Sequence, residues 1–160
     1  MQAGNWTWRR ASVSGRCVMF DLDGVLSDAA GRQRFVEGGK ITDWKAFFDA
    51  CADDPLIAEL HQLLVLLDPA LRVVLLTARP ARVQPETVAW LSRYDVRWDL
   101  LVMRNDADHR PAEAFKRESL NAIGAHGFEV LLAFEDDRRN VAMFREAGVP
   151  CVYIHSGYYE

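Results

Sequence analysis

The sequence has few cysteines and no long apolar segment. Its three cysteines, Cys17, Cys51 and Cys151, are odd in number and form no C-x-x-C pair, so neither a disulfide framework nor a zinc site is indicated. No apolar run approaches the roughly 18 residues of a membrane-spanning helix, and the N-terminal segment lacks the apolar core of a secretory signal. We therefore expect a cytoplasmic protein without a membrane partner.

An excess of positive charge is also missing. The net charge is -4, and 26% of the 160 residues are charged, which argues against an extended basic surface that wraps nucleic acid. No G-x-x-x-x-G-K-[ST] loop occurs, so a P-loop kinase is excluded. The length fits one domain over residues 1–160, with residues 1–16 as an N-terminal extension.

What the sequence does contain is a series of short apolar runs alternating with helical patterns. Runs rich in Val, Leu, Ile and Phe, without polar alternation, indicate strands covered on both faces. They lie at Cys17–Phe20, Leu71–Leu76, Leu100–Met103, Val130–Phe134 and Cys151–Ile154. This alternation predicts an α/β fold with a parallel, doubly wound sheet.

The connections between the strands carry further signals. Apolar spacing over 56–67 predicts the helix that crosses from the first strand to the second, which leaves residues 28–55 as a small insertion. Within it, Thr42 is the expected N-cap of a short helix that begins near Trp44. Gly148 stands where a left-handed helix cap is expected.

Polar residues cluster directly after the apolar runs. Ligands bind at the carboxyl ends of the strands in such sheets, so we expect these residues to meet at one edge. The set comprises Asp21, Asp23, Thr77, Arg79, Glu135, Asp136 and Asp137. Several carboxylates at one edge need a counter-charge and suit Mg²⁺. The Thr77 hydroxyl and the Lys116 ammonium would complete a phosphate pocket.

The order D-x-D-G-V, strand-T, Lys, strand-E-D resembles the haloacid dehalogenase-like (HAD) phosphohydrolase superfamily from Cys17 to Ile154. The resemblance implies a Rossmann-like three-layer core with a minimal cap after the first strand. It also implies that Asp21 is a nucleophile that becomes an aspartyl-phosphate and that Asp23 is the general acid and base. Thr77 and Lys116 would hold the phosphoryl oxygens.

The same resemblance implies a Mg²⁺ site made by Asp21, the backbone carbonyl of Asp23 and the acidic residues after the fourth strand. The family usually uses the first one or two of these acids, which favours Glu135 and Asp136 as ligands. Asp137 would instead cap the helix that follows.

A closer similarity connects the segment "LVMRNDADHRPAEAFKRESL" to the phosphatase domains of bacteriophage polynucleotide kinase-phosphatases, with Arg104, Asp108, Arg110 and Lys116 matching. This resemblance implies a polynucleotide 3′-phosphatase whose partner is a nucleic-acid 3′-phosphate end. Arg79, Arg104 and Arg110 are the expected substrate-binding residues. Arg79 has an equal alternative interpretation, as an ion-pair partner of the surplus carboxylates.

Other interpretations stay open. A small-molecule HAD phosphatase, such as a nucleotidase or an acid phosphatase, would use the same catalytic residues, and a non-catalytic binding domain would need none of them intact. The segment Trp6–Arg10 fits either a nucleic-acid stacking arm or a packing extension. The short insertion leaves the site open to a polymer.

Overall fold

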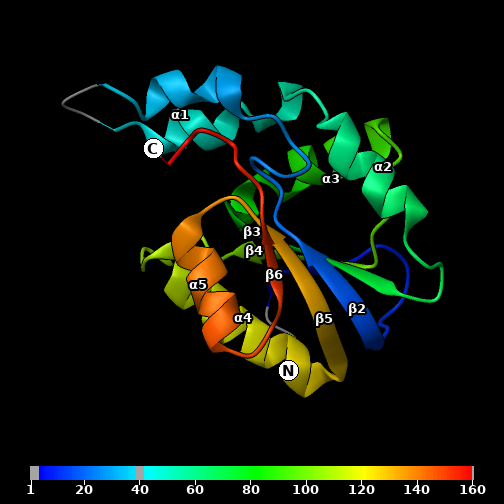
Figure 1. The fold of residues 1–160 in the computed structure, drawn as a ribbon. Coiled ribbons are helices and arrows are strands. Elements are labelled where there is room, and N and C mark those ends of the chain that lie inside the picture. Colours follow the sequence, from blue (N-terminus) through cyan, green and yellow to red (C-terminus); the bar gives the residue numbers. More distant parts are fainter. Residues whose placement is uncertain (1–3, 39–41, 160) are drawn as a thin grey trace.

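The computed structural model describes residues 4–38 and 42–159, which form one sheet with helices on both faces (Figure 1). The strands are β1 (Trp6–Trp8), β2 (Gly15–Phe20), β3 (Arg72–Pro80), β4 (Leu100–Arg104), β5 (Phe128–Glu135) and β6 (Cys151–Tyr153). The α-helices are α1 (Trp44–Asp49), α2 (Ala58–Leu66), α3 (Gln84–Arg93), α4 (Ala112–His126) and α5 (Arg138–Glu146). Short 3-10 helices are η1 (Ala30–Phe35), η2 (Cys51–Asp53) and η3 (Ala81–Val83).

The five predicted strands are confirmed as β2 to β6, and all of them run parallel. The order across the sheet is β1-β4-β3-β2-β5-β6. β5, which carries the acidic residues at its end, therefore lies between β2 and β6. The predicted α/β class is confirmed, with β2 at the centre of the sheet beside both β3 and β5.

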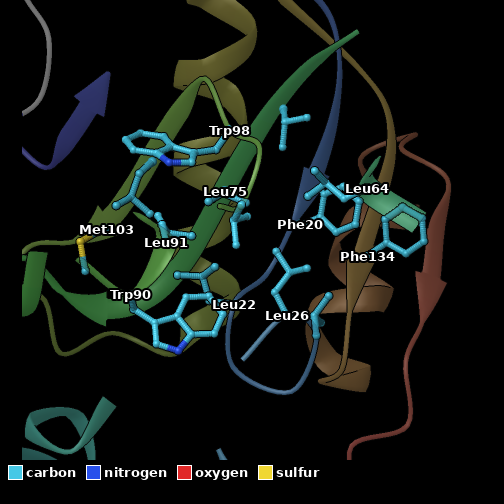
Figure 2. Packing of buried hydrophobic residues seen from close by; sticks show 14 of the residues in the cluster. Phe20, Leu22, Leu26, Leu64, Leu75, Trp90, Leu91, Trp98, Met103 and Phe134 are labelled. Carbon is cyan, nitrogen blue, oxygen red and sulfur yellow. The ribbon is translucent and has the colours of Figure 1, made fainter. Parts of the chain in front are cut away.

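Two apolar clusters hold the three layers together. Alternate residues of β2 point to opposite faces, so Val18 and Phe20 belong to one cluster, while Cys17 and Met19 belong to the other. The first cluster packs against α2 and α3, and the second packs against α4 and α5. Figure 2 shows the first cluster, in which the rings of Phe20 and Phe134 stack with centroids 4.6 Å apart.

The helices end as their sequences predict. Gly148 lies in the left-handed region at φ 82°, just past the end of α5, and its N–H donates to the carbonyl of Arg145 at 3.0 Å. The predicted crossover helix over 56–67 is α2. None of the helices within the described residues is both long enough and apolar enough to span a membrane.

The N-terminal extension forms a strand that the sequence analysis did not predict. β1 pairs antiparallel with β4, with Trp6 opposite Val102 and Trp8 opposite Leu100. The Trp6 and Trp8 rings lie against His126, with centroids 5.5 and 5.2 Å from its ring. Of the two interpretations of this segment, the packing extension is the one that the structure supports, because both tryptophan rings are used in contacts with the end of α4.

The small insertion over 28–55 contains η1, α1 and η2, while its positions 39–41 lie outside the described residues. The predicted N-cap was wrong by one residue. Asp43, and not Thr42, caps α1, and its carboxylate accepts a hydrogen bond from the Ala46 N–H at 3.0 Å. A carboxylate also interacts more favourably than a hydroxyl with the positive end of a helix dipole.

Candidate active site

Asp21 directly follows β2 and lies at the centre of the site. Its N–H donates to the carbonyl of Phe134 in β5 at 3.1 Å, which continues the sheet pairing by one residue. The residue is 8% exposed, and its carboxylate faces Lys116, whose Nζ lies 3.2 Å from Asp21 Oδ1. The N–H of Leu22 donates to the same oxygen at 2.8 Å. These two donors fix the orientation of the carboxylate.

Lys116 connects α4 to the end of β5. Its Nζ donates to Glu135 Oε2 at 2.7 Å, while the other oxygen of Glu135 accepts from the N–H groups of Asp136 and Asp137. Burial acts to lower the pKa of Lys116, but the carboxylates of Asp21 and Glu135 outweigh it, so the pKa is raised and the ammonium stays charged. The predicted meeting of Lys116 with the strand ends is therefore observed.

Negative charge is in excess around this lysine. Asp21, Glu135 and Asp136 are all buried, and one carboxylate oxygen from each lies within 4.8 Å of the others. Burial raises the pKa of Asp21 well above its ordinary value, and Glu135 raises it further. Burial and then Glu135 raise the pKa of Asp136 to about 7. One lysine thus does not compensate three carboxylates, and the ionised forms need a further cation.

Asp136 provides an independent test of whether a metal fits here. Neither of its buried carboxylate oxygens has a hydrogen-bond partner within the part of the chain that the structure describes, an expensive arrangement unless a ligand binds them. Gly24 makes room for this side chain, because a Cβ on Gly24 would lie 2.1 Å from Asp136 Oδ2. Hard carboxylate oxygens in this arrangement fit Mg²⁺.

Asp23 lies in a separate network of buried ion pairs. Arg79 contacts Asp23 Oδ1 through Nε at 3.0 Å and Nη2 at 2.6 Å, and Arg32 Nη2 contacts the same oxygen at 2.6 Å. Burial acts to raise the pKa of Asp23, but Arg79 and Arg32 outweigh it and the pKa is lowered. Asp23 is therefore ionised in this arrangement.

Arg32 and Asp54 are site residues that the sequence analysis missed. The Asp54 carboxylate accepts from Arg32 Nε at 2.8 Å and Nη2 at 2.6 Å, and from Ser27 Oγ at 2.6 Å. Both residues belong to the small insertion, where arginines and aspartates are common and no spacing distinguishes these two. The sequence offered one general signal: carboxylates that are expected to be buried need positively charged partners, so an arginine near them was to be expected.

The predicted substrate arginines have different surroundings. Arg79 is fully buried and donates to Asp23, Ser27 and Thr87. These contacts match its interpretation as an ion-pair partner of the carboxylates. Arg110 is about half exposed and pairs with Asp108 at 2.7 Å and Glu118 at 2.5 Å.

Arg104 and Thr77 complete the set. The Arg104 guanidinium lies 5.4 Å from the centre of the Phe115 ring, and its buried Nε has no hydrogen-bond partner within the described residues. Thr77 is buried in β3 beside the Asp21–Asp23 segment, since Leu75 pairs with Phe20, and its Oγ1 accepts from the Arg79 N–H at 3.1 Å. Asp137 caps α5 as expected, by accepting from the Arg139 N–H.

Comparison with known proteins places this site in a family. The profile described as the polynucleotide kinase PNKP phosphatase domain matches residues 15–159. The chain belongs to this family. It is accordingly a HAD-type phosphatase, and the resemblance inferred from the D-x-D, Thr, Lys and E-D elements is confirmed.

Solved structures agree with this assignment. A chain in the Pnkp1/Rnl/Hen1 RNA repair complex superposes with a TM-score of 0.74 at 25% identity over 96% of the phosphatase and 47% of that chain. A second Pnkp1/Rnl/Hen1 structure gives 0.73 at 25% identity, over 92% and 50%. The phosphatase thus spans about half the length of these relatives. Class C acid phosphatase from Bacillus anthracis shares the fold alone, with a TM-score of 0.60 at 11% identity over 94% and 70%. No curated protein matches the sequence.

Proposed function

We propose that this phosphatase is a Mg²⁺-dependent phosphomonoesterase that removes 3′-phosphates from nucleic-acid ends through an aspartyl-phosphate at Asp21. The observation that carries the proposal is the buried group Asp21, Lys116, Glu135 and Asp136, which combines a fixed carboxylate with a charged lysine at the carboxyl ends of the strands. Membership of the family supplies the reaction class.

In the first step, a carboxylate oxygen of Asp21 bonds to phosphorus while the bond between phosphorus and the sugar oxygen breaks. Lys116 and the Leu22 N–H hold Oδ1 of Asp21, so the carboxylate cannot rotate away and the ground state is oriented for attack. Lys116 and Thr77 would donate to the transferring phosphoryl oxygens, on which charge is spread in the transition state.

Asp23 handles the proton. It gives a proton to the departing sugar oxygen in the first step. In the second step it takes a proton from water as the water oxygen bonds to phosphorus and the bond to Asp21 breaks. Arg32 and Arg79 hold Asp23 ionised in the free protein, and the negative charge of an arriving phosphate acts to raise its pKa so that it binds a proton before the first step.

Asp21, Asp136 and Glu135, with the backbone carbonyl of Asp23, would hold Mg²⁺. When bound, the ion offsets the charge of the carboxylates and of the phosphate, which lowers the barrier to attack by one anion on another. The unpaired oxygens of Asp136 and its raised pKa support this assignment.

The choice of a nucleic-acid end rests on the relatives and on one arginine. Two of the solved structures with which this chain superposes over most of its length, those at 25% identity, come from an RNA repair complex. Arg104, at the carboxyl end of β4, is partly exposed, and a guanidinium there can pair with a phosphate or stack on a base.

The test compares phosphate release from a 3′-phosphorylated oligonucleotide, a 5′-phosphorylated one, a 3′-mononucleotide and a panel of sugar phosphates, each with Mg²⁺ and with EDTA. We expect the 3′-phosphorylated oligonucleotide to give the highest kcat/KM and EDTA to stop the reaction. Asp21→Asn is the matched control, since it keeps the side-chain volume and removes the nucleophile. Faster turnover of sugar phosphates would assign the protein to metabolite hydrolysis.

A further inference from the structure

The C-terminal segment over 154–159 passes close to the site. The sequence analysis predicts no function for it. The Ile154 N–H donates to the carbonyl of Glu135 at 2.8 Å, which carries the chain past the acidic end of β5. In Figure 1 the segment, drawn in red, continues from β6 beyond the carboxyl ends of the strands toward α1. It therefore runs along the same edge of the sheet as Asp21 and Asp136.

Two contacts hold this segment in place. Ser156 lies against Gly24 and Asp136, since a Cβ on Gly24 would be 3.0 Å from the Ser156 Cβ. The Tyr158 hydroxyl donates to Asp28 Oδ1 at 3.1 Å, and the Tyr158 N–H donates to Ser156 Oγ at 3.3 Å. The backbone is thus held between the acidic end of β5 and the start of the insertion, immediately before Tyr159.

Tyr159 extends from this fixed backbone and is 52% exposed. The segment that carries it lies beside Gly24 and Asp136, which brings Tyr159 near the acidic end of β5. Buried aromatic rings of this chain, such as Phe20, serve the core, whereas Tyr159 is exposed enough for a ligand to reach its ring.

Arg139 stands beside this ring. Its guanidinium carbon lies 6.0 Å from the centre of the Tyr159 ring, and its Nη2 is held by Asp137 Oδ2 at 2.9 Å. The arginine side chain is 64% exposed, so it presents a positive charge next to an aromatic surface. Aromatic and arginine side chains in such pairs stack on bases and contact the adjoining backbone phosphate.

We propose that Tyr159, with Arg139 beside it, is the platform on which the terminal base of the substrate stacks while its 3′-phosphate lies at Asp21. This inference rests on the proposed function and adds to it a specificity-determining residue. Stacking is tolerant of sequence because every base has a flat face, so the platform selects a nucleoside without selecting which one.

The experiment measures kcat/KM for a 3′-phosphorylated oligonucleotide with an intact terminal nucleoside and for one whose terminal base is removed. A simple alkyl phosphate serves as a third substrate. Tyr159→Ala should lower kcat/KM on the intact oligonucleotide roughly five- to hundredfold, mainly through KM, and should leave the other two substrates within about twofold. Removal of the base should cost the wild-type protein a similar factor and cost Tyr159→Ala nothing.

Two variants make the interpretation specific. Tyr159→Phe keeps the ring and should behave as the wild type, and Val152→Ala, which also trims an exposed apolar side chain near the C-terminal segment, should do the same. Equal losses of Tyr159→Ala on all substrates, no loss at all, or a loss in Tyr159→Phe as large as in Tyr159→Ala would each overturn the platform. A wild-type protein that favours the alkyl phosphate would instead overturn the proposed function itself.

Discussion

Asp136→Asn should stabilise the metal-free protein at pH 8, and its effect on the unfolding free energy should be less favourable at pH 5. The substitution removes a buried carboxyl group whose pKa is raised from an ordinary value of 3.8 to about 7. A carboxyl group whose pKa is higher in the folded than in the unfolded protein destabilises the folded state as the pH rises above its unfolded-state pKa. The destabilisation reaches its full size above the folded-state pKa. The affected window is therefore between about pH 4 and pH 7.

The magnitude follows from this difference. Relative to a group that never ionises, the Asp136 carboxyl costs the folded state about 2 kcal/mol at pH 5 and about 4 kcal/mol at pH 8. The asparagine amide itself is buried with few partners, which costs ~1–3 kcal/mol at either pH. Because that cost does not depend on pH, the gain in unfolding free energy should be larger by about 2 kcal/mol at pH 8 than at pH 5.

Urea unfolding of both proteins in EDTA at the two pH values measures this change. With saturating Mg²⁺ at pH 8 the advantage of the variant should shrink by up to about 2.7 kcal/mol, because a ligand present at 100 times its Kd stabilises the wild type by that amount and the variant lacks one of the ligand groups. A variant that is destabilised equally at pH 5 and pH 8, or that gains from Mg²⁺ as much as the wild type, would refute both the buried charge excess and the metal site.

Three further substitutions test other parts of the site. Asp23→Asn should reduce kcat about 10²- to 10⁴-fold for an alkyl phosphate and much less for an aryl phosphate, whose leaving group needs no proton; equal losses on the two substrates would contradict the proton-transfer role. Arg32→Ala should lower the unfolding free energy by ~3–5 kcal/mol, because it leaves the buried Asp54 without its main partner, and unchanged urea denaturation would show that the ion pairs contribute nothing. The same variant should move the alkaline limb of the pH profile of kcat/KM upward, since Arg32 lowers the pKa of Asp23 and Asp23 must be protonated to act as the acid in the first step. Arg110→Ala should leave the unfolding midpoint unchanged and lower kcat/KM about tenfold more for the oligonucleotide than for an aryl phosphate, whereas equal losses would assign Arg110 to the shared chemistry.

The sequence predicts the parts of this protein that depend on repeated local patterns. Five buried strands were readable because each is a continuous apolar run, and the parallel topology then placed Asp21, Thr77 and Glu135 at one edge. β1 was not predicted because a three-residue segment with two tryptophans has too little pattern to distinguish a strand from a loop. Its pairing with β4 depends on a tertiary contact.

The ion-pair network around Asp23 could not be predicted from the sequence for a similar reason, since it depends on tertiary contacts. Arg32 and Asp54 lie 22 positions apart in an insertion without regular spacing, and their contact depends on how η1 and η2 fold over Asp23. The Trp90 indole N–H donates to the Asp54 carbonyl at 2.8 Å and helps to fix that position. Arg79 has two chemically reasonable partners, a carboxylate or a phosphate, and only its burial distinguishes them.

The three-residue pairing of β1 has a consequence for the behaviour of shortened chains. The family match begins at residue 15, so β1 lies outside the matched region. A chain that starts there keeps every candidate catalytic group but uncovers one side of β4, whose residues Leu100–Met103 are all buried. A bare apolar strand at the rim of a sheet is a template on which a second molecule adds its own strand. Such a chain would therefore self-associate through β4 while it keeps its catalytic residues. In the longer chain, β1 covers this edge of β4 and prevents that association.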